Sequence, residues 1–265
     1  MDKEKEKGAV VLPENAFREL KDGETYEPLM SPNKTYREVT PWSVTWGLVM
    51  VVLFSAAAAY LGLKVGQVFE AAIPIAIIAI GLSTATHRKN ALGENVIIQS
   101  IGACSGAVVA GGIFVMPAIY MLDLQADFIK IFIAAALGGI LGILFLIPFR
   151  KYFVKDMHGK YPFPEATATT QVLVSGGEGG SQAKPLLVAG LVGGAYDFIV
   201  ATFGWWNENV TSRMIGLGQD LADKAKLVVK VNTGAAVLGL GYIIGLRYAA
   251  IICAGSVFVW WIIVP

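Results

Sequence analysis

The chain has 265 residues, of which 55% are apolar and only 15% are charged. Soluble domains carry about 25% charged residues, so the charges of this chain are too few to cover a water-facing surface. This composition excludes a soluble enzyme, a nucleic-acid-binding protein and a secreted disulfide scaffold, and it indicates an integral membrane protein. The net charge of +1 points to no particular partner.

The charges are concentrated at the start of the chain. Residues 1–40 hold seven Lys or Arg and nine Asp or Glu, which is 16 of the 41 charged residues. This stretch also contains three prolines and has no sustained hydrophobic periodicity, as is typical of a disordered segment. We therefore predict a disordered cytoplasmic tail over residues 1–40 and a transmembrane domain over residues 41–265.

Charged residues divide the transmembrane domain into about six apolar stretches. A helix crosses the hydrocarbon core of a bilayer with about 20 residues. The predicted spans lie at 39–63, 65–87, 95–122, 131–149, 185–206 and 231–265. Arg247 interrupts the last stretch, which is therefore either one long, tilted span or two short ones around a break.

Residues 162–177 fit none of these spans, although they are apolar enough to enter a bilayer. Pro162 and Pro164 suit the first turn of a helix, and Gly176 and Gly177 suit its end. Because a helix of this length is too short to cross, we predict a re-entrant half-helix. Such a segment is tolerated only where it is buried in protein or lines a water-filled cavity.

Loop charges predict the orientation, since Lys and Arg are enriched in cytoplasmic loops. Basic residues gather after the second and the fourth span, whereas the loop after the third span holds Asp123 and Asp127 with a single Lys130. This pattern places the N-terminus and the loops after spans two and four in the cytoplasm. Beyond the fourth span the charges indicate no clear orientation.

Ionisable side chains at bilayer depth are candidates for function, because a charge there costs at least about 2.5 kcal/mol. Asp197 has twelve uncharged residues before it and ten after it, and it serves either proton or substrate handling or a hydrogen bond between helices. Glu165 follows two prolines at a helix start, where a capping role is the alternative. The remaining candidates are Lys64, Glu70, Glu94 and Arg247.

Polar and small residues mark possible helix contacts. Asn95 and Gln99 are four residues apart and share one helical face, which serves either hydrogen bonds between helices or a hydrated binding surface. Small residues four apart let helices approach closely. Such pairs are Gly102–Gly106, Gly138–Gly142, Gly190–Gly194 and Gly241–Gly245.

The sequence contains no apparent cluster of metal ligands. Its two cysteines, Cys104 and Cys253, lie inside apolar stretches, where cysteine usually packs as a small residue. Its two histidines, His87 and His158, stand apart beside basic residues. It also lacks the Ser/His, paired-Asp or HExxH arrangement of an intramembrane enzyme. We therefore expect no metal site, no cofactor and no enzymatic activity.

Four short stretches in chain order resemble the oligopeptide transporter family. They are LGLKVG at 61–66, AIP at 72–74, GENVIIQSIGACSGAVVAGGIFVMPA at 93–118 and PFPEATA at 162–168. The family includes peptide carriers and the yellow-stripe-like carriers of metal–chelate complexes, and its bacterial branch is the most similar. Ala166 stands where the family pattern has glycine. Family members are also about twice as long, so the resemblance implies the N-terminal part of a carrier in a bacterial inner membrane.

The resemblance implies a proton-coupled symporter of short peptides or metal–chelate complexes in the lipid bilayer, with the missing C-terminal half as a partner. Secondary carriers bind substrate at discontinuous helices whose N-termini face anionic groups, and residues 162–177 supply such a terminus. The expected substrate-binding residues are Asn95, Gln99, Pro164, Glu165 and Thr167. The expected proton-coupling residues are Glu94, Glu165 and Asp197. The alternatives are a channel, or an inactive truncated remnant or non-transport membrane subunit.

Overall fold

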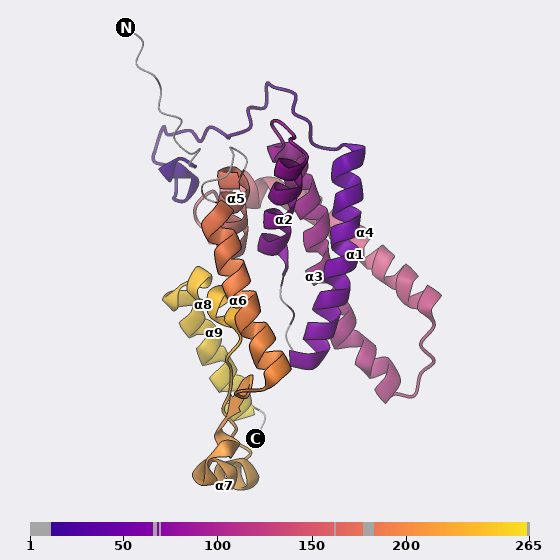
Figure 1. Cartoon of the computed structure of the whole chain (residues 1–265), viewed down its shortest axis with the longest axis vertical. Helices are drawn as coiled ribbons and strands as arrows, with labels where there is room; N and C mark the ends of the chain where they lie inside the picture. The colour runs from indigo at the N-terminus through magenta and orange to yellow at the C-terminus, as the bar shows by residue number, and fades with distance from the viewer. Residues whose placement is uncertain (1–11, 66–67, 69, 162, 177–182, 264–265) are drawn as a thin grey trace. The chain divides into compact units, whose positions relative to one another are not determined.

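The computed structural model describes residues 12–65, 68, 70–161, 163–176 and 183–263 (Figure 1). Residues 1–11 of the predicted tail lie outside this described part, and the disorder predicted for the tail stays a prediction. Contacts within the chain define two compact units, Met1–Ala183 and Lys184–Pro265.

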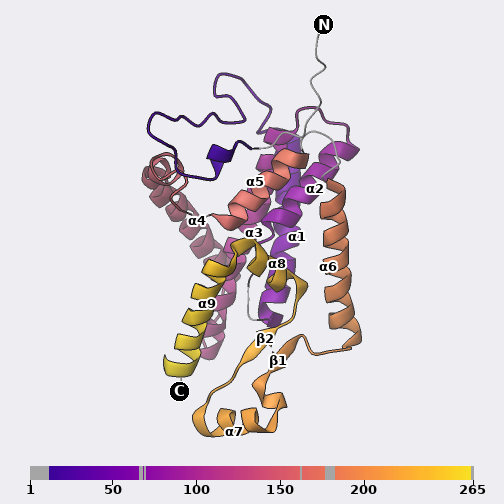
Figure 2. The ribbon, with the colours of Figure 1, turned by 90° about the vertical axis from the view of Figure 1, so that its left-hand side faces the viewer.

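The core of the first unit lies between three helices. The elements of this unit are η1 (Glu14–Ala16), α1 (Pro41–Val65), α2 (Ala72–Ala85), α3 (Leu92–Met121), α4 (Phe128–Lys151), η2 (Tyr152–Asp156) and α5 (Pro164–Gly176). α1 packs along α3, and α2 packs against both α3 and α5 (Figures 1 and 2). The core comprises Met50 of α1, Ile75 and Ala79 of α2, and Ile98 of α3.

Glycines bring these helices close together. A Cβ atom on Gly47 of α1 would lie 2.8 Å from the Cβ of Ile101 on α3. A Cβ atom on Gly102 of α3 would lie 2.8 Å from the Cγ2 of Ile75 on α2. Both distances are shorter than van der Waals contact, so a larger residue would force the helices apart. Gly102 therefore packs helices, as its spacing from Gly106 predicts.

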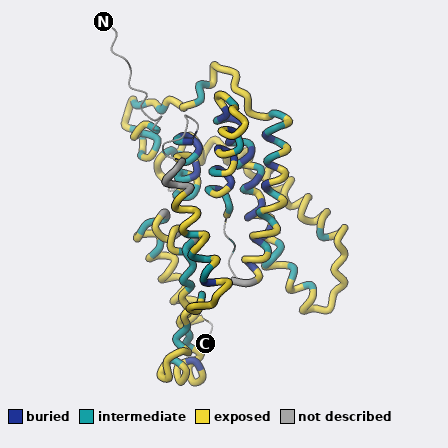
Figure 3. Tube along the Cα trace, viewed as in Figure 1, coloured by how far each residue is buried: buried dark blue, intermediate teal, exposed yellow. Residues whose placement is uncertain are grey.

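α4 differs from α1 and α3. Asp127 caps its start by accepting a hydrogen bond from the backbone N–H of Ile129 at 3.0 Å. No residue of α4 is buried against the described part of the chain (Figure 3). A Cβ atom on Gly138 or Gly142 would meet no described atom within 4 Å. The glycine pair of α4 therefore has no packing partner among the described residues.

Two helices of the first unit are shorter than a membrane span. α2 has 14 residues and lies inside the predicted span 65–87. α5 has 13 residues, begins at Pro164 and ends at Gly176. Pro162 and Gly177, which also belong to the predicted half-helix, lie outside the described residues. The short helix is confirmed, whereas its re-entrant course stays a prediction.

The second unit contains helices and a small two-stranded sheet. Its elements are α6 (Ala183–Phe203), β1 (Asn209–Thr211), η3 (Ser212–Met214), α7 (Gly216–Ala225), β2 (Lys230–Asn232), α8 (Ala235–Ile244), α9 (Leu246–Phe258) and η4 (Val259–Ile263). β1 and β2 pair antiparallel with Val210 opposite Val231, and α7 lies beyond their far end (Figure 2). Gly245, with φ of 82°, separates α8 from α9. The last apolar region thus forms two helices around a break, one of the two predicted arrangements.

Among the described residues, four helices are long and apolar enough to cross a membrane: Pro41–Leu63, Leu92–Met121, Phe128–Asp156 and Leu246–Ile263. Two shorter apolar helices, Ala72–Ala85 and Val188–Phe203, accompany them. The protein is therefore an all-α, multi-pass helix bundle, as its composition predicts. The count of about six spans stays a prediction.

Candidate substrate cavity

A cavity of about 360 Å³ opens in the first unit. It lies between α3, α5, the start of α2 and irregular residues that precede α1 and α2. Its apolar lining includes Leu92, Val96 and Leu173. Its polar lining consists of Glu70, Gln99, Glu165, Thr169 and Thr170. The volume lies within the range of about 300–1,000 Å³ that is typical of small-molecule sites.

Helical periodicity explains why these residues meet. Val96, Gln99 and Ala103 of α3 are three and four residues apart and therefore share one face. On α5, Glu165 and Thr169 are likewise four residues apart. Both faces line the cavity. The sequence predicts Gln99 and Glu165 as substrate-binding residues, and the structure brings them to the same cavity from different helices.

The Glu165 carboxylate faces this cavity without a partner among the described residues. Glu165 is half-buried, and only its backbone carbonyl oxygen accepts a hydrogen bond, from the Thr169 hydroxyl at 2.8 Å. The Glu70 side chain lines the same cavity, and no described cation pairs with it. Two carboxylates thus face one cavity with no described counter-charge.

Asn95 and Gln99 share a helix face but have different surroundings. Asn95 is buried, with 1% of its surface exposed, and its side-chain oxygen accepts a hydrogen bond from the Ser83 hydroxyl on α2. Gln99 is half-buried and lines the cavity. Asn95 therefore joins α2 and α3, which is one of the two roles that its position predicts. The side chain of Gln99 remains available to bind a ligand in the cavity.

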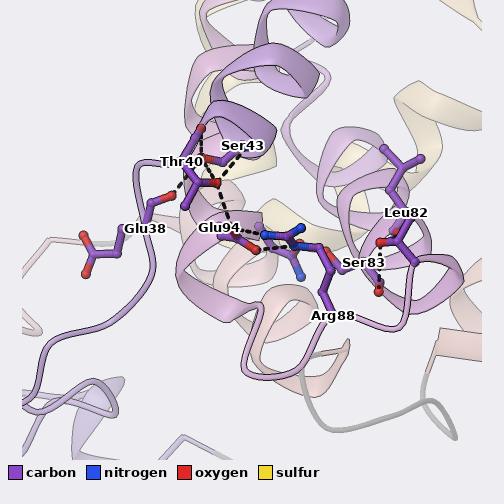
Figure 4. A network of polar contacts seen from close by, with 9 residues as sticks. Glu38, Thr40, Ser43, Leu82, Ser83, Arg88 and Glu94 are labelled. Atoms are coloured by element: carbon purple, nitrogen blue, oxygen red, sulfur yellow. Dashed lines mark hydrogen bonds and ion pairs between the residues drawn. The ribbon is translucent and has the colours of Figure 1, made fainter.

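A polar network fixes the start of α3 (Figure 4). Glu94 is only 2% exposed. Its carboxylate accepts hydrogen bonds from Arg88 Nε at 2.7 Å and Nη2 at 2.6 Å, and from the Thr40 hydroxyl at 2.7 Å. The hydrogen bonds to Glu94 raise the pKa of Arg88 above its ordinary value. The Arg88 guanidinium also lies 5.1 Å from the ring centroid of Trp42, close enough for a cation–π contact.

This network joins the start of α1, the loop after α2 and the start of α3. Arg88 and Glu94 stand six residues apart on either side of a helix start, and such a spacing predicts no contact by itself. The sequence alone therefore does not predict Arg88 as the partner of Glu94. Because Arg88 holds the Glu94 carboxylate in this conformation, a role of Glu94 in proton coupling would require that the ion pair open.

The family model for "OPT oligopeptide transporter protein" matches residues 38–265. The chain belongs to the oligopeptide transporter family. It is 30% identical over 210 residues to a protein of Haemophilus influenzae described as a "putative oligopeptide transporter". The match covers 78% of this chain but only 32% of that relative. No solved structure matches the chain significantly.

In this oligopeptide transporter family member, Asp197 lies in the second unit and is half-buried. Its Oδ1 accepts a hydrogen bond from the backbone N–H of Ala235, the first residue of α8, at 2.8 Å. The neighbouring Tyr196 hydroxyl donates to the carbonyl oxygen of Thr233 at 3.1 Å. Asp197 therefore links α6 to the start of α8. A hydrogen bond between helices is one of the two roles predicted for Asp197, and the other, proton or substrate handling, stays a prediction.

Pro164 and Thr167, the other two expected binding residues, lie in the first turn of α5. Pro164 begins the helix, where the lack of an N–H group is harmless. The backbone N–H of Thr167 donates to the carbonyl oxygen of Phe163 at 2.8 Å. Both residues are half-buried, and neither is among the residues that line the cavity. Their role in binding stays a prediction.

The charged side chains in the lining of the cavity are those of Glu70 and Glu165. The residues that line it include neither His nor Cys. Over the described part of this family member, no group of three or more His, Cys, Asp or Glu could hold a metal ion. The lining is suited to a ligand that forms hydrogen bonds and carries a positive group.

Proposed function

We propose that this chain forms part of the substrate path of a proton-coupled carrier of short peptides. The observation that carries the proposal is the cavity of about 360 Å³ lined by Gln99 and by Glu165, whose carboxylate has no partner among the described residues. Secondary carriers bind their substrates at discontinuous helices near the middle of the membrane. α5, at 13 residues, has the length of such a half-helix.

The cavity lining favours a peptide over a metal–chelate complex. A peptide carries an ammonium group, which a carboxylate such as Glu165 would bind. Its backbone amides need both donors and acceptors, and the amide group of Gln99 supplies both. The name of the Haemophilus influenzae relative also refers to oligopeptides. Metal–chelate transport remains the second candidate because the yellow-stripe-like branch carries such complexes.

Proton coupling needs a group that binds and releases a proton along the substrate path. Glu165 and Glu70 both line the cavity, and no described cation neutralises either of them. We propose that protonation of Glu165 accompanies the binding or release of the peptide. Asp197 and Glu94 are weaker candidates, since each already bonds to protein groups.

The chain spans 32% of the length of the relative it matches, and transport by the whole protein is therefore part of the proposal. We propose that the cavity is one part of the substrate path and that residues outside this chain form the rest of it. We also propose a bacterial inner-membrane location with the N-terminus in the cytoplasm. The basic loop at Arg88 and Lys89 supports this orientation.

Uptake of a labelled tripeptide by cells that express the protein from its own gene tests the proposal. Replacing Glu165→Gln keeps the size of the side chain and removes its proton site. We expect uptake driven by an imposed proton gradient to fall to the level seen without the gradient, because the glutamine amide cannot take up and release a proton as a carboxylate does. Protein level in the membrane should stay unchanged.

Asp123→Asn provides the matched control. Asp123 is exposed at the end of α3 and has a φ of 55°, a conformation that asparagine also adopts readily. Tripeptide uptake by the Asp123→Asn variant should equal that of the wild type. Uptake by the Glu165→Gln variant with unchanged pH dependence would contradict the assignment of Glu165.

A further inference from the structure

A second pocket in the first unit has a basic lining. It measures about 680 Å³ and lies between residues 29–37 and the loop before α3. Lys34, Arg37 and Lys89 line it, together with the polar groups of Thr35 and Asn90 and the ring of Tyr36. The pocket thus brings together three cations from two segments that are far apart in the sequence.

None of these three cations forms an ion pair with a described residue. The Glu94 carboxylate is close enough to Arg37 for their charges to interact, but it already accepts two hydrogen bonds from Arg88. Figure 4 shows the Glu38 carboxylate directed away from the Arg88–Glu94 pair. Like charges around one concavity repel each other, and a bound anion would relieve that repulsion.

The pocket also has an apolar lining. Leu29, Met30, Leu92 and Val174 belong to it. A small soluble anion would gain nothing from it, whereas an amphiphilic molecule would place its charged group on the cations and its first methylene groups on the apolar side chains. The lining therefore combines the basic and the apolar side chains that a phospholipid headgroup and its first methylene groups would contact.

The position of the pocket along the helices agrees with this chemistry. Leu92 and Gly93 of the lining open the apolar helix α3, and Arg37 lies four residues before the start of α1 at Pro41. Apolar spans begin where the hydrocarbon core begins, so this end of the bundle lies at the level of the lipid headgroups. Basic side chains at that level attract anionic lipids.

We propose that the pocket lined by Lys34, Arg37 and Lys89 binds the phosphate headgroup of an anionic membrane lipid. The bound lipid would link residues 29–37 to the loop before α3 through a phosphate shared by cations from both segments. This site adjoins the peptide cavity, with which it shares the apolar residues Leu29, Met30, Leu92 and Val174. The charged residues of the two sites are different, so substitutions of those residues test the two proposals separately.

Binding of a fluorescent phosphatidylglycerol to the purified chain in detergent tests the site. The variant Lys34→Gln, Arg37→Gln, Lys89→Gln removes its three charges. Basic residues near a membrane surface contribute about 1 kcal/mol each to the attraction of anionic lipid. We therefore expect the affinity to fall by about tenfold or more. Phosphatidylcholine, which has the same phosphate but no net charge, should bind weakly to both proteins.

The matched control removes the same number of charges elsewhere on the same predicted side. It carries Arg150→Gln, Lys151→Gln and Lys155→Gln, at exposed residues that end α4 and follow it. Its affinity for phosphatidylglycerol should stay within about twofold of wild type. An equal loss in both variants would show general charge attraction and overturn the site, as would unchanged affinity in the pocket variant.

Two further arms complete the experiment. If inorganic phosphate displaces the fluorescent lipid as effectively as unlabelled phosphatidylglycerol does, the pocket binds a soluble phosphate and the lipid proposal is wrong. The single variant Lys89→Gln guards against misfolding of the triple variant, because a surface change of this kind has little effect on stability. It should lower the affinity by a smaller but measurable factor, and an unchanged affinity would count against the site.

Discussion

α3 and α4 look alike in the sequence and differ in the structure. Both are long and apolar, and each carries two glycines four residues apart. On α3, Gly102 packs against Ile75 with no room for a Cβ atom. On α4, a Cβ atom on Gly138 would meet no described atom within 4 Å. Hydropathy therefore identifies membrane helices, but it does not show which helices they pack against.

Polar residues account for the difference. α3 carries Glu94, Asn95 and Ser105 on its buried side, and two of them bind groups of the loop before α3 and of α2. α4 has no charged or amide side chain between Lys130 and Arg150. Lipid is as apolar as a leucine side chain, so small and polar residues rather than apolar ones hold membrane helices together. α3 has both kinds of contact within the described chain.

The largest effect is expected where the polar network fixes the start of α3. Arg88→Met would leave the buried Glu94 carboxylate without its cation, and burying an unpaired charge is costly. The midpoint of thermal unfolding, measured on the purified protein in detergent, should fall further for Arg88→Met than for the glycine and serine variants described below. Lys130→Met is the control at the start of α4, since Lys130 is 84% exposed and lies 3.7 Å from Asp127. Equal midpoints for the two variants would contradict the role of the network.

A smaller effect should distinguish the two glycine pairs. Gly102→Leu would insert a side chain against Ile75 of α2, and overpacking of this kind typically costs about 1–3 kcal/mol. Gly138→Leu on α4 should leave stability unchanged or raise it slightly, because leucine favours the helix more than glycine does. Chemical unfolding of both variants in mixed micelles provides the measurement. Equal destabilisation would show that α4 packs as tightly as α3.

The hydrogen bond between α2 and α3 should have a smaller effect again. Ser83→Ala would leave the side-chain oxygen of buried Asn95 without its described donor, which should cost about 1 kcal/mol. Thr86→Ala removes an exposed hydroxyl that bonds only to backbone carbonyls near the end of α2, and it should change stability by less than about 0.5 kcal/mol. If the two variants were equally stable, the Ser83–Asn95 contact would not contribute to helix packing.

The smallest effect concerns the half-buried ion pair of Arg18 and Glu24 before α1. Hydrogen bonds from Arg18 lower the pKa of Glu24 from 4.5 to about 2. Because the pKa is lower in the folded protein, the pair stabilises the fold above pH 4.5, and this contribution is lost as the pH falls towards about 2. Thermal unfolding of the wild type and of Glu24→Gln should therefore differ slightly at neutral pH and converge under acid conditions. A difference that grows with acidity would contradict the sign of the shift.

Much of the fold follows from the sequence. The lengths of uncharged stretches located α1, α3 and α4, because the cost of charge in lipid is large and local. Prolines and glycines located α5, since both residues have strong positional preferences at helix ends. The short length of α2 was not predicted, because an apolar stretch does not show where a helix begins. The two-stranded sheet of β1 and β2 was not predicted either, because a strand of three residues is too short to show an alternation of apolar and polar residues.

The candidate site was predictable in part. Gln99 and Glu165 were expected from their residue types and positions, and they line one cavity. Asn95 shares a face with Gln99, but the sequence could not show that Ser83 of α2 would bind it. Arg88 and Glu94 pair through the geometry of a loop, and no periodic pattern reports such a contact. Partner choice across helices depends on packing, which a single sequence does not contain.

The most direct test of the account is whether the cavity side of α3 meets the substrate. Cys104 and Cys253 are exposed and would first be replaced by serine. The rate of maleimide labelling of Gln99→Cys would then be measured in membranes with and without a tripeptide, beside Gly142→Cys on α4. If the peptide binds in the cavity, it should slow the labelling of Gln99→Cys and leave the labelling of Gly142→Cys unaffected. Labelling of Gln99→Cys at the same rate with saturating peptide would contradict binding in the cavity.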